Sequence, residues 1–316
     1  MHGRVVVLPL GAGPSLPLLE AASPSVATAT IWPGMGAAAR SIVWFRLGAG
    51  SSTRAFRHSG EAVYFVRAGS GTVVGATGGG DATSPHGHEL SAGAVVHVAP
   101  GTPYRFRSAP ADGLDLVGGP CPPDPSWFPD TAHADVSTTT TAETLSEASF
   151  QAPLQASLDE TTSVVDDGPG IQVFSSEEPA LMLPLISSDA RMIAWPGNGA
   201  WDATMNYVRM EPGEENSEHA HAHSEDTIVI LEGRGSVDDL SVGQTLEFTA
   251  GDVIHVPARV RHAVRANRGS PVVSVGGPCP ADLAFLRRCG ADLPESRSVE
   301  RASQAVPQEG TSQVVQ

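Results

Sequence analysis

Residues 213–233 read GEENSEHAHAHSEDTIVILEG, which places a cluster of histidines and acids directly before a short apolar run. The run Thr227–Leu231 is β-branched and soon meets Gly233, a pattern that predicts a buried strand. His219 and His221 are two positions apart, so both side chains lie on one face of an extended segment. A carboxylate a few residues later would add a third ligand for a first-row transition metal. Taken alone, the stretch suits a solvated, His-rich turn equally well.

A second group of residues, about thirty positions after the cluster, supplies what a metal site still needs. Gly251 and Asp252 open an apolar run that ends at Val256, and Pro257 and His262 follow it. An imidazole from this neighbouring strand would complete a site of three histidines and a carboxylate, with open positions for a substrate or oxygen. The two groups together favour a metal site over a surface turn.

The chain contains the same unit twice. Trp32-Pro33-Gly34-x-Gly36 recurs as Trp195-Pro196-Gly197-x-Gly199, and Gly118-Gly119-Pro120-Cys121-Pro122 recurs as Gly276-Gly277-Pro278-Cys279-Pro280. Self-similarity of this kind indicates two copies of one structural unit. We therefore expect a first domain at residues 1–128, a linker at 129–168, a second domain at 169–290 and a disordered tail at 291–316. The linker is rich in Ser, Thr and acidic residues, as expected of a segment that crosses the surface.

Both units consist of short, β-branched runs bounded by turns, such as Ala62–Val66, Ala94–Val98 and Asp252–Val256. Gly and Pro, with 34 and 26 copies, supply many turn residues. Runs this short at this spacing predict an all-β protein built as a sandwich or small barrel. The clearest helical signal is Pro280–Arg288, which has basic residues in its last turn.

The spacing of these residues resembles that of the cupin superfamily. Gly213, five residues, His219-x-His221, four residues, Asp226, six residues and Gly233 fit the first cupin motif with Asp in place of Glu. Gly251, five residues, Pro257-x-Arg259, two residues and His262 fit the second motif, with Arg259 replacing a Gly and Asn267 standing one place late. Because the resemblance covers both units, it implies a bicupin: two antiparallel jelly-roll barrels in tandem, joined by the Ser/Thr/acidic linker.

By this resemblance the metal ligands of the second barrel are His219, His221, His262 and Asp226. Glu225 fits a shorter spacing of the same motif, so the choice of acid stays open between Asp226 and Glu225. The resemblance also implies one divalent transition metal, with iron favoured over manganese, nickel, cobalt or zinc.

The first unit departs from the motif. Phe56 stands where the second unit has His219, Ala62 where it has Asp226, and Tyr104 where it has His262. His58 alone survives, so we expect this barrel to be metal-free. Glu61 could still supply one carboxylate, and His86-x-His88 has ligand-like spacing on what we interpret as a solvated hairpin.

Other side chains of the second unit are candidates for substrate binding. Arg209 could point inward and bind a carboxylate in bidentate fashion, although an outward position is at least as compatible with its strand. Arg259, His255 and His223 are further candidates, with a buried structural role as the alternative for His255 and a solvent-facing role for His223. Cys121 and Cys279 occupy the same turn in both units, which favours a structural role.

Composition excludes several function classes. All 19 basic residues are Arg, so no Lys is present to form a Schiff base or a Walker phosphate loop. The net charge of −16 argues against nucleic acid and anionic membranes as partners. No apolar run approaches the ~20 residues that span a bilayer. Three Cys residues make an odd count that fits a reducing compartment, so we expect a cytoplasmic protein.

These observations lead to a functional hypothesis for the second barrel. We expect an oxygen-dependent dioxygenase that acts on a small organic substrate, with Asp226 or Glu225 as ligand or proton acceptor. Two alternative hypotheses stay open. A redox-neutral metal-dependent isomerase, lyase or decarboxylase would use the same site, and a non-catalytic protein could bind a small ligand there. Bicupins often associate through their sheets, so the resemblance also implies a homodimer.

Overall fold

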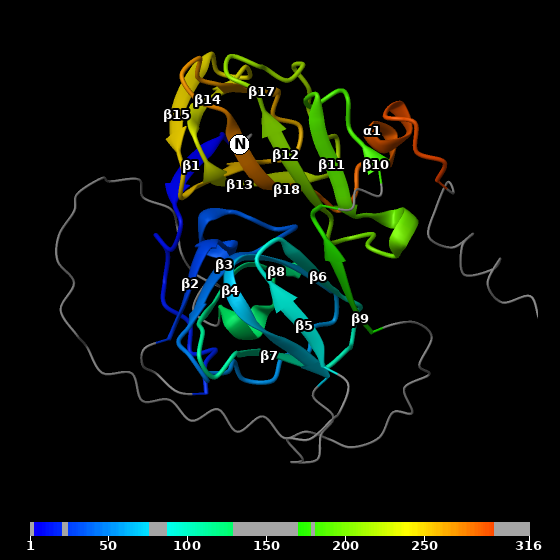
Figure 1. Ribbon diagram of the computed structural model, residues 1–316. Helices are drawn as coiled ribbons and strands as arrows, with labels where there is room; N and C mark the ends of the chain where they lie inside the picture. Colours follow the sequence, from blue (N-terminus) through cyan, green and yellow to red (C-terminus); the bar gives the residue numbers. More distant parts are fainter. Residues whose placement is uncertain (1–2, 21–24, 76–86, 129–169, 178–180, 294–316) are drawn as a thin grey trace, which may run out of the picture.

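Two antiparallel β-barrels lie one above the other in the computed structural model (Figure 1), which describes residues 3–20, 25–75, 87–128, 170–177 and 181–293. The expected all-β architecture of two jelly rolls in tandem is confirmed. The predicted linker, the predicted tail from residue 294 onward and His86 lie outside the described residues, while His88 is exposed on a short strand.

The first barrel is built around the long strand β4, which pairs with strands of both its sheets. One sheet has the order β2-β3-β8-β4-β6-β9, and β5 and β7 flank the far half of β4. The strands of this barrel are β2 (Val26–Ile31), β3 (Ile42–Leu47), β4 (Glu61–Gly75), β5 (His88–Ser91), β6 (Ala94–Val98), β7 (Tyr104–Ser108), β8 (Leu114–Cys121) and β9 (Ile171–Ser175). Two short 3-10 helices, η1 (Pro33–Met35) and η2 (Pro125–Trp127), lie at its edges.

The second barrel repeats this plan. Its larger sheet has the order β1-β16-β13-β18-β12-β11-β10, and its smaller sheet has the order β15-β14-β17. The strands are β1 (Val6–Pro9), β10 (Leu181–Met182), β11 (Asp189–Ala194), β12 (Met205–Met210), β13 (Glu225–Glu232), β14 (Arg234–Asp239), β15 (Gln244–Thr249), β16 (Asp252–Val256), β17 (His262–Ala266) and β18 (Val272–Cys279). The 3-10 helix η4 (Pro196–Asn198) and the α-helix α1 (Leu283–Arg288) complete it, and α1 falls within the predicted helical segment.

The larger sheets of the two barrels pack against each other, so their strands are buried on both faces. Along β4, Tyr64 and Val66 point into the first barrel, whereas Val63 and Phe65 join a separate apolar cluster between the barrels. The second barrel contributes Met205, Val229, Val253 and Val275 to that cluster. Burial on both sides explains why these strands read as nearly continuous apolar runs in the sequence.

The two barrels exchange their edge strands. Strand β1, from the start of the chain, pairs with β16 of the second barrel, where Val6 lies opposite His255. Strand β9, which follows the predicted linker, pairs with β6 of the first barrel, where Gln172 lies opposite His97. The pairing of the sheets therefore does not follow the division at residues 128 and 169 expected from the repeat, because each repeat donates its first strand to the other barrel (Figure 1).

The repeated Gly-Gly-Pro-Cys-Pro segment lies at the junction of the barrels. The sequence predicts a turn there, but the Gly-Gly-Pro-Cys residues form the ends of β8 and β18. Gly276 has a φ of +153°, and a Cβ there would collide with the carbonyl oxygen of Thr227, so only glycine fits. The Sγ atoms of Cys121 and Cys279 lie 3.7 Å apart, and both thiols are buried and free. The buried Arg40 guanidinium donates to the Thr227 hydroxyl at 3.2 Å.

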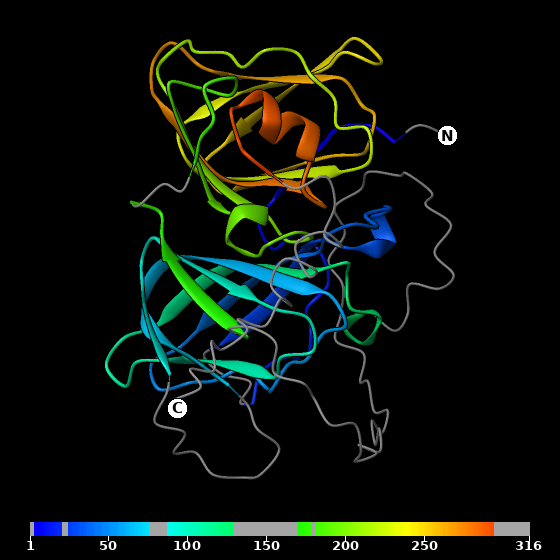
Figure 2. The same cartoon turned by 90° about the vertical axis from the view of Figure 1, so that its right-hand side faces the viewer.

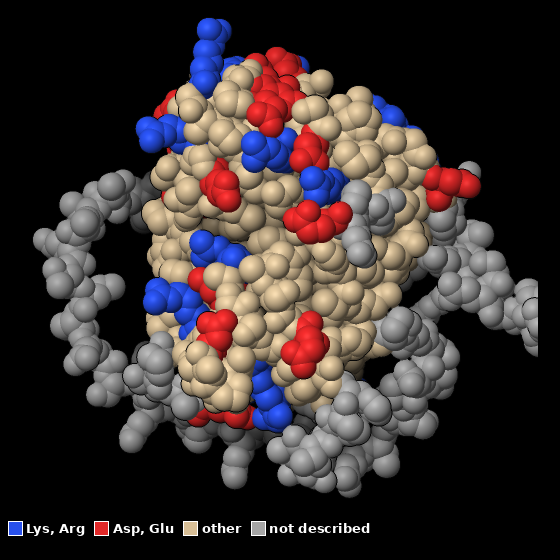
Figure 3. All heavy atoms as spheres, in the orientation of Figure 1, with Lys and Arg blue, Asp and Glu red and all other residues tan. Residues whose placement is uncertain are grey.

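The surface carries charges of both signs. On the face shown in Figure 3, acidic and basic side chains of the described residues are interspersed among uncharged ones. Among the described residues, no helix is long and apolar enough to span a membrane.

Candidate metal centre

Three elements of the second barrel bring four side chains together. Asp226 is the second residue of β13, and His262 is the first residue of β17. His219 is held opposite His262 by two backbone hydrogen bonds, His219 N to His262 O at 3.1 Å and the reverse bond at 2.9 Å. The carbonyl of His221 accepts a hydrogen bond from the backbone N–H of Arg259 at 2.8 Å. Backbone pairing thus fixes the places of all three histidines before any ligand binds.

The four side chains form a compact cluster. One potential ligand atom from each of His219, His221, Asp226 and His262 lies within 4.8 Å of the others. Asp226 Oδ2 lies 3.7 Å from His262 Nε2 and 3.9 Å from His221 Nε2. Three of the residues are buried and His219 is partly exposed, so the cluster is reached from the His219 side. The sequence-predicted ligands are therefore brought together at one point inside the barrel.

Each histidine of the cluster has its Nδ1 atom next to an acceptor. The acceptors are the Ser217 carbonyl at 2.8 Å from His219, the Asp282 carboxylate at 2.9 Å from His221 and the Val260 carbonyl at 3.1 Å from His262. A carbonyl or carboxylate only accepts, so each Nδ1 carries a proton, and the neutral form of each ring has its lone pair on Nε2. The tautomer needed for metal binding is thereby preset in all three rings.

The charges within the cluster also suit a cation. Burial, together with the neighbouring His262 and His221, lowers the pKa of His219 to about 4, so this ring is neutral at pH 7. Burial alone would raise the pKa of Asp226, but the nearby imidazoles of His262 and His221 outweigh it and lower the pKa to about 2. Burial alone would lower the pKa of His221, but Asp282 and Asp226 outweigh it and raise the pKa. The site thus presents a buried, ionised carboxylate beside the neutral His219.

Two buried atoms of the cluster have no hydrogen-bond partner: Asp226 Oδ1 and His262 Nε2. Buried polar atoms nearly always have a hydrogen-bond partner, so two unpartnered atoms within one cluster indicate a missing partner there. Three imidazole nitrogens and one carboxylate oxygen form a donor set typical of first-row divalent metals. The described residues thus fit a metal ion at this point.

Glu225, the alternative carboxylate, lies on the other face of β13. Adjacent residues of a strand point to opposite sides, so Asp226 faces the barrel interior and Glu225 faces the first barrel. The Glu225 carboxylate accepts hydrogen bonds from the backbone of Ala38 and Ala39 at 2.9–3.1 Å, and His255 Nε2 lies 3.4 Å away. Burial alone would raise the pKa of Glu225, but His255 and the two amides lower it. Glu225 joins the two barrels, and neither it nor His255 reaches the cluster.

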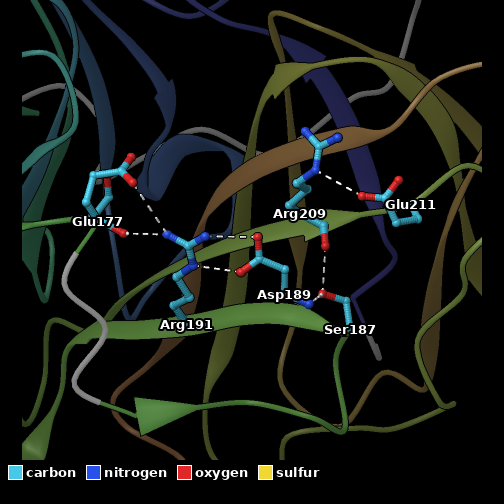
Figure 4. A network of polar contacts seen from close by, with 7 residues as sticks. Glu177, Ser187, Asp189, Arg191, Arg209 and Glu211 are labelled. Carbon is cyan, nitrogen blue, oxygen red and sulfur yellow. Dashed lines mark hydrogen bonds and ion pairs between the residues drawn. The ribbon is translucent and has the colours of Figure 1, made fainter.

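Arg209, expected as a possible inward cation, points out of the barrel. Its neighbours on β12, Val208 and Met210, fill the interior, so the alternating Arg209 faces outward. Its Nε donates to Glu211 at 3.0 Å, beside the paired Arg191 and Asp189 (Figure 4). Of the two orientations considered for Arg209, the structure has the outward one.

Arg259 and His223 are exposed and belong to the loops beside the cluster. Arg259 Nε donates to the Ala222 carbonyl at 3.2 Å. The φ of Arg259 is +69°, a left-handed conformation that glycine adopts without strain. This residue stands at the motif position where the resemblance expects glycine, so the backbone keeps the glycine conformation although the side chain has changed.

The corresponding point of the first barrel is filled by a chain of hydrogen bonds. His58 Nδ1 lies 2.6 Å from Asp124 Oδ2, His58 Nε2 lies 2.9 Å from the Tyr104 hydroxyl, and that hydroxyl lies 2.5 Å from the Tyr64 hydroxyl. Burial raises the pKa of both tyrosines, so both hydroxyls stay protonated. Phe56 packs against His58 and Tyr104. Glu61 faces the second barrel and accepts from the backbone of Asp202 and Ala203.

Sequence reasoning missed Asp282 and Phe285, which lie directly behind the histidines. Asp282 contacts His221, and Phe285 packs on both His219 and His221 with ring centroids 6.2 and 6.1 Å away. A signal was present, because Asp124 and Trp127 follow the first Cys-Pro at the same spacing as Asp282 and Phe285 follow the second.

Comparison with known proteins agrees with this architecture. Residues 206–275, which include His219, His221, Asp226 and His262, match the cupin domain family. Solved two-barrel cupins superpose on nearly the whole chain: oxalate decarboxylase from Bacillus subtilis covers 98% of this chain and 85% of its own, with a TM-score of 0.60 and 16% identity. The chain has the fold of a two-domain cupin. The sequence-based assignment to the cupin superfamily is confirmed.

Further solved structures and one curated relative resemble this bicupin. The protein Ylba from E. coli covers 90% of this chain and 94% of its own at a TM-score of 0.58 and 15% identity. A putative glyoxylate-induced protein from Pseudomonas aeruginosa covers 89% and 91% at a TM-score of 0.59 and 14% identity. The polyketide synthase CurC of Streptomyces cyaneus is 37% identical over 67 residues, which span 21% of this chain and 42% of that protein. At 14–16% identity the structural likeness shows the fold alone.

Proposed function

We propose that this bicupin is a metal-dependent enzyme whose second barrel binds one divalent first-row transition ion, with iron favoured. The ligands would be His219, His221 and His262 through Nε2, and Asp226 through its carboxylate. The observation that carries the proposal is the cluster itself: one potential ligand atom from each of its four residues lies within 4.8 Å of the others, and two of its buried atoms, Asp226 Oδ1 and His262 Nε2, have no hydrogen-bond partner. For the reaction we favour a dioxygenase that acts on a small organic substrate.

A bound ion would supply a Lewis acid with open positions for a substrate and for oxygen. The protein side chains do the rest. The partly exposed His219 marks the side from which a substrate approaches, and the buried, ionised Asp226 would hold the ion together with the three imidazoles. The apolar side chains of Ile230, Val264 and Phe285 pack in the same interior, and Phe285 also contacts His219 and His221.

Charge near the cluster limits the substrate. The chain has no Lys, and within the described part of the second unit no Arg side chain is buried. An anionic substrate would therefore find its main countercharge in the metal ion. Arg259, exposed on the loop beside His221, is the first side chain to test as a contact for an anionic group, and His223 is the second.

The test begins with the metal. Elemental analysis of protein purified from iron-supplemented cells should give about one equivalent for the wild type and little for His219→Ala and His262→Ala. Metal retained after both substitutions would overturn the ligand assignment. A wild type without metal that still binds small ligands would instead support a non-catalytic binding protein.

Oxygen chemistry is tested separately. Nitric oxide, added without air to the iron-loaded protein as an analogue of oxygen, should give a high-spin iron–nitrosyl EPR signal if a position is open. Oxygen uptake is then followed over a panel of small phenols, enols and carboxylic acids. Turnover of any of these under strict anaerobiosis would replace the dioxygenase by a redox-neutral isomerase, lyase or decarboxylase.

We also infer a cytoplasmic location and a homodimer. The odd count of three Cys supports a reducing compartment. Light scattering of the purified protein measures the oligomeric state, and a monomer at micromolar concentration would exclude the homodimer.

A further inference from the structure

The segment that follows each barrel's last strand repeats the same short pattern. Cys121-Pro122-x-Asp124-x-x-Trp127 in the first unit corresponds to Cys279-Pro280-x-Asp282-x-x-Phe285 in the second. In both units the Asp begins a short helix, η2 or α1, and the aromatic residue of that helix covers a histidine of the barrel. The pattern lies outside the residues 206–275 that match the cupin domain family.

Asp282 makes two different contacts with its two carboxylate oxygens. Oδ1 accepts a hydrogen bond from the backbone N–H of Phe285 at 3.0 Å, which caps the start of α1. Oδ2 accepts from His221 Nδ1 at 2.9 Å. Burial alone would raise the pKa of Asp282, but His221 and the helix amides lower it, so the carboxylate is ionised. One side chain therefore connects the helix to a residue of the metal centre.

His221 differs from the other two histidines in the charge of its partner. His219 and His262 donate to the neutral carbonyls of Ser217 and Val260, whereas His221 donates to a carboxylate. A carboxylate behind a ligating imidazole fixes its orientation and makes its free nitrogen a stronger donor to a metal. Of the three Nε2 atoms proposed to bind the ion, that of His221 is therefore expected to be the strongest donor.

We propose that Asp282 is a positioning residue of the metal centre: it holds His221 with Nε2 directed at the ion and links metal binding to the docking of α1 on the barrel (Figure 2). This inference rests on the proposed metal centre. Since both contacts belong to one carboxylate, ordering His221 by a metal also favours the capped helix, and the capped helix favours the ligating orientation of His221. Phe285 of α1 adds to this link through its contacts with His219 and His221.

Two substitutions separate the helix cap from the contact with His221. Asn and Ser begin helices about as well as Asp, so Asp282→Asn and Asp282→Ser keep an acceptor for the Phe285 N–H. In Asp282→Asn the amide that replaces Oδ2 is a donor, which opposes the His221 Nδ1 proton and favours the tautomer protonated at Nε2. The matched control is Asp124→Asn, which makes the same change against His58 in the first barrel.

The readout is metal affinity, measured with Co²⁺ alone by its visible absorption and by competition with a chelating dye. We expect Asp282→Asn and Asp282→Ser to weaken Co²⁺ binding by about 10- to 100-fold, while Asp124→Asn leaves it unchanged. The unfolding temperature of the metal-free Asp282→Ser protein should stay close to that of the wild type. Hydrogen exchange of the wild type should show slower exchange of the α1 amides after Co²⁺ is added.

The outcomes separate the two levels of the proposal. Wild-type affinity in both Asp282 variants, or equal loss in Asp124→Asn, would overturn the role of Asp282 and leave the metal centre standing. A wild type that binds no Co²⁺ would overturn the metal centre itself, and Asp282 with it. If the Asp282 variants fail to fold, the exchange experiment on the wild type decides, and α1 amides insensitive to Co²⁺ would overturn the link.

Discussion

Both barrels contain a hydrogen-bonded histidine–aspartate pair at the same place, but the histidine faces a different partner in each. In the first barrel His58 lies between Asp124 and the Tyr104 hydroxyl, and in the second His221 lies between Asp282 and the point faced by His262 and Asp226. A histidine–aspartate pair thus also occurs in the barrel where the other cluster residues are replaced. What distinguishes the barrels is the atom opposite the imidazole Nε2: a hydroxyl completes the first network, whereas the second leaves orphaned ligand atoms.

The largest effect should come from giving the second barrel the tyrosine of the first. His262→Tyr removes one of the four proposed ligands and places a hydroxyl where Tyr104 stands in the other barrel. We expect metal affinity to fall by about 100-fold or more, since losing a ligand costs more than losing a residue behind one. Metal content after dialysis measures this, and one full equivalent in the variant would contradict the assignment of His262.

Acid stability of the metal-free protein should depend on His219. Its pKa is lowered by burial to about 4 in the folded state, whereas an exposed histidine titrates near 6.5. The unfolded chain therefore binds more protons between these values, and stability falls as the pH decreases from about 6.5 to about 4, by on the order of 3 kcal/mol.

His219→Phe, which copies Phe56 of the first barrel, should flatten the pH dependence in that window. Urea unfolding at a series of pH values, with the metal removed by a chelator, compares the variant with the wild type. Parallel curves would show that His219 is not the group responsible.

Tyr104→Phe tests the closed network of the first barrel. The substitution removes the hydroxyl that lies 2.9 Å from His58 Nε2 and 2.5 Å from the Tyr64 hydroxyl, both in a buried site. We expect a loss of about 1–3 kcal/mol in the free energy of unfolding, because buried polar groups lose a partner. Metal content should not change, and a fall in metal content would show that the first barrel contributes to the metal centre.

The smallest effect concerns Arg259 at its left-handed φ of +69°. Arg259→Gly relieves backbone strain of roughly 1–2 kcal/mol but adds freedom to the unfolded chain, so we expect a net stabilisation below about 1 kcal/mol. Metal affinity should stay at the wild-type value, because the hydrogen bond to the His221 carbonyl comes from the backbone. Thermal unfolding and Co²⁺ titration measure the two quantities, and weaker Co²⁺ binding would assign the side chain a role at the site.

The sequence sufficed for the two-barrel fold and for the four clustered residues, because both are encoded in short spacings: strand-length runs, a repeated Gly-Gly-Pro-Cys-Pro segment and the histidine motif. It did not separate Asp226 from Glu225, since both spacings fit and only the face that each presents on β13 decides. The sequence did not predict the exchange of β1 and β9 either. An edge strand of four or five residues has no sequence pattern that identifies the distant strand with which it pairs. The sequence did contain a signal for Asp282, because Asp124 stands at the same position of the first unit.

The exchanged strands have a consequence for any attempt to study the barrels apart. A chain cut between residues 128 and 170 yields one fragment that carries β1 without β16 and lacks β9, and another that opens with β9 and lacks β1. Each fragment would expose the backbone of β6 or β16 as a bare sheet edge, a surface that invites aggregation. The barrel with the candidate metal centre therefore depends for a complete sheet on β1, a strand more than two hundred positions before the histidines in the sequence.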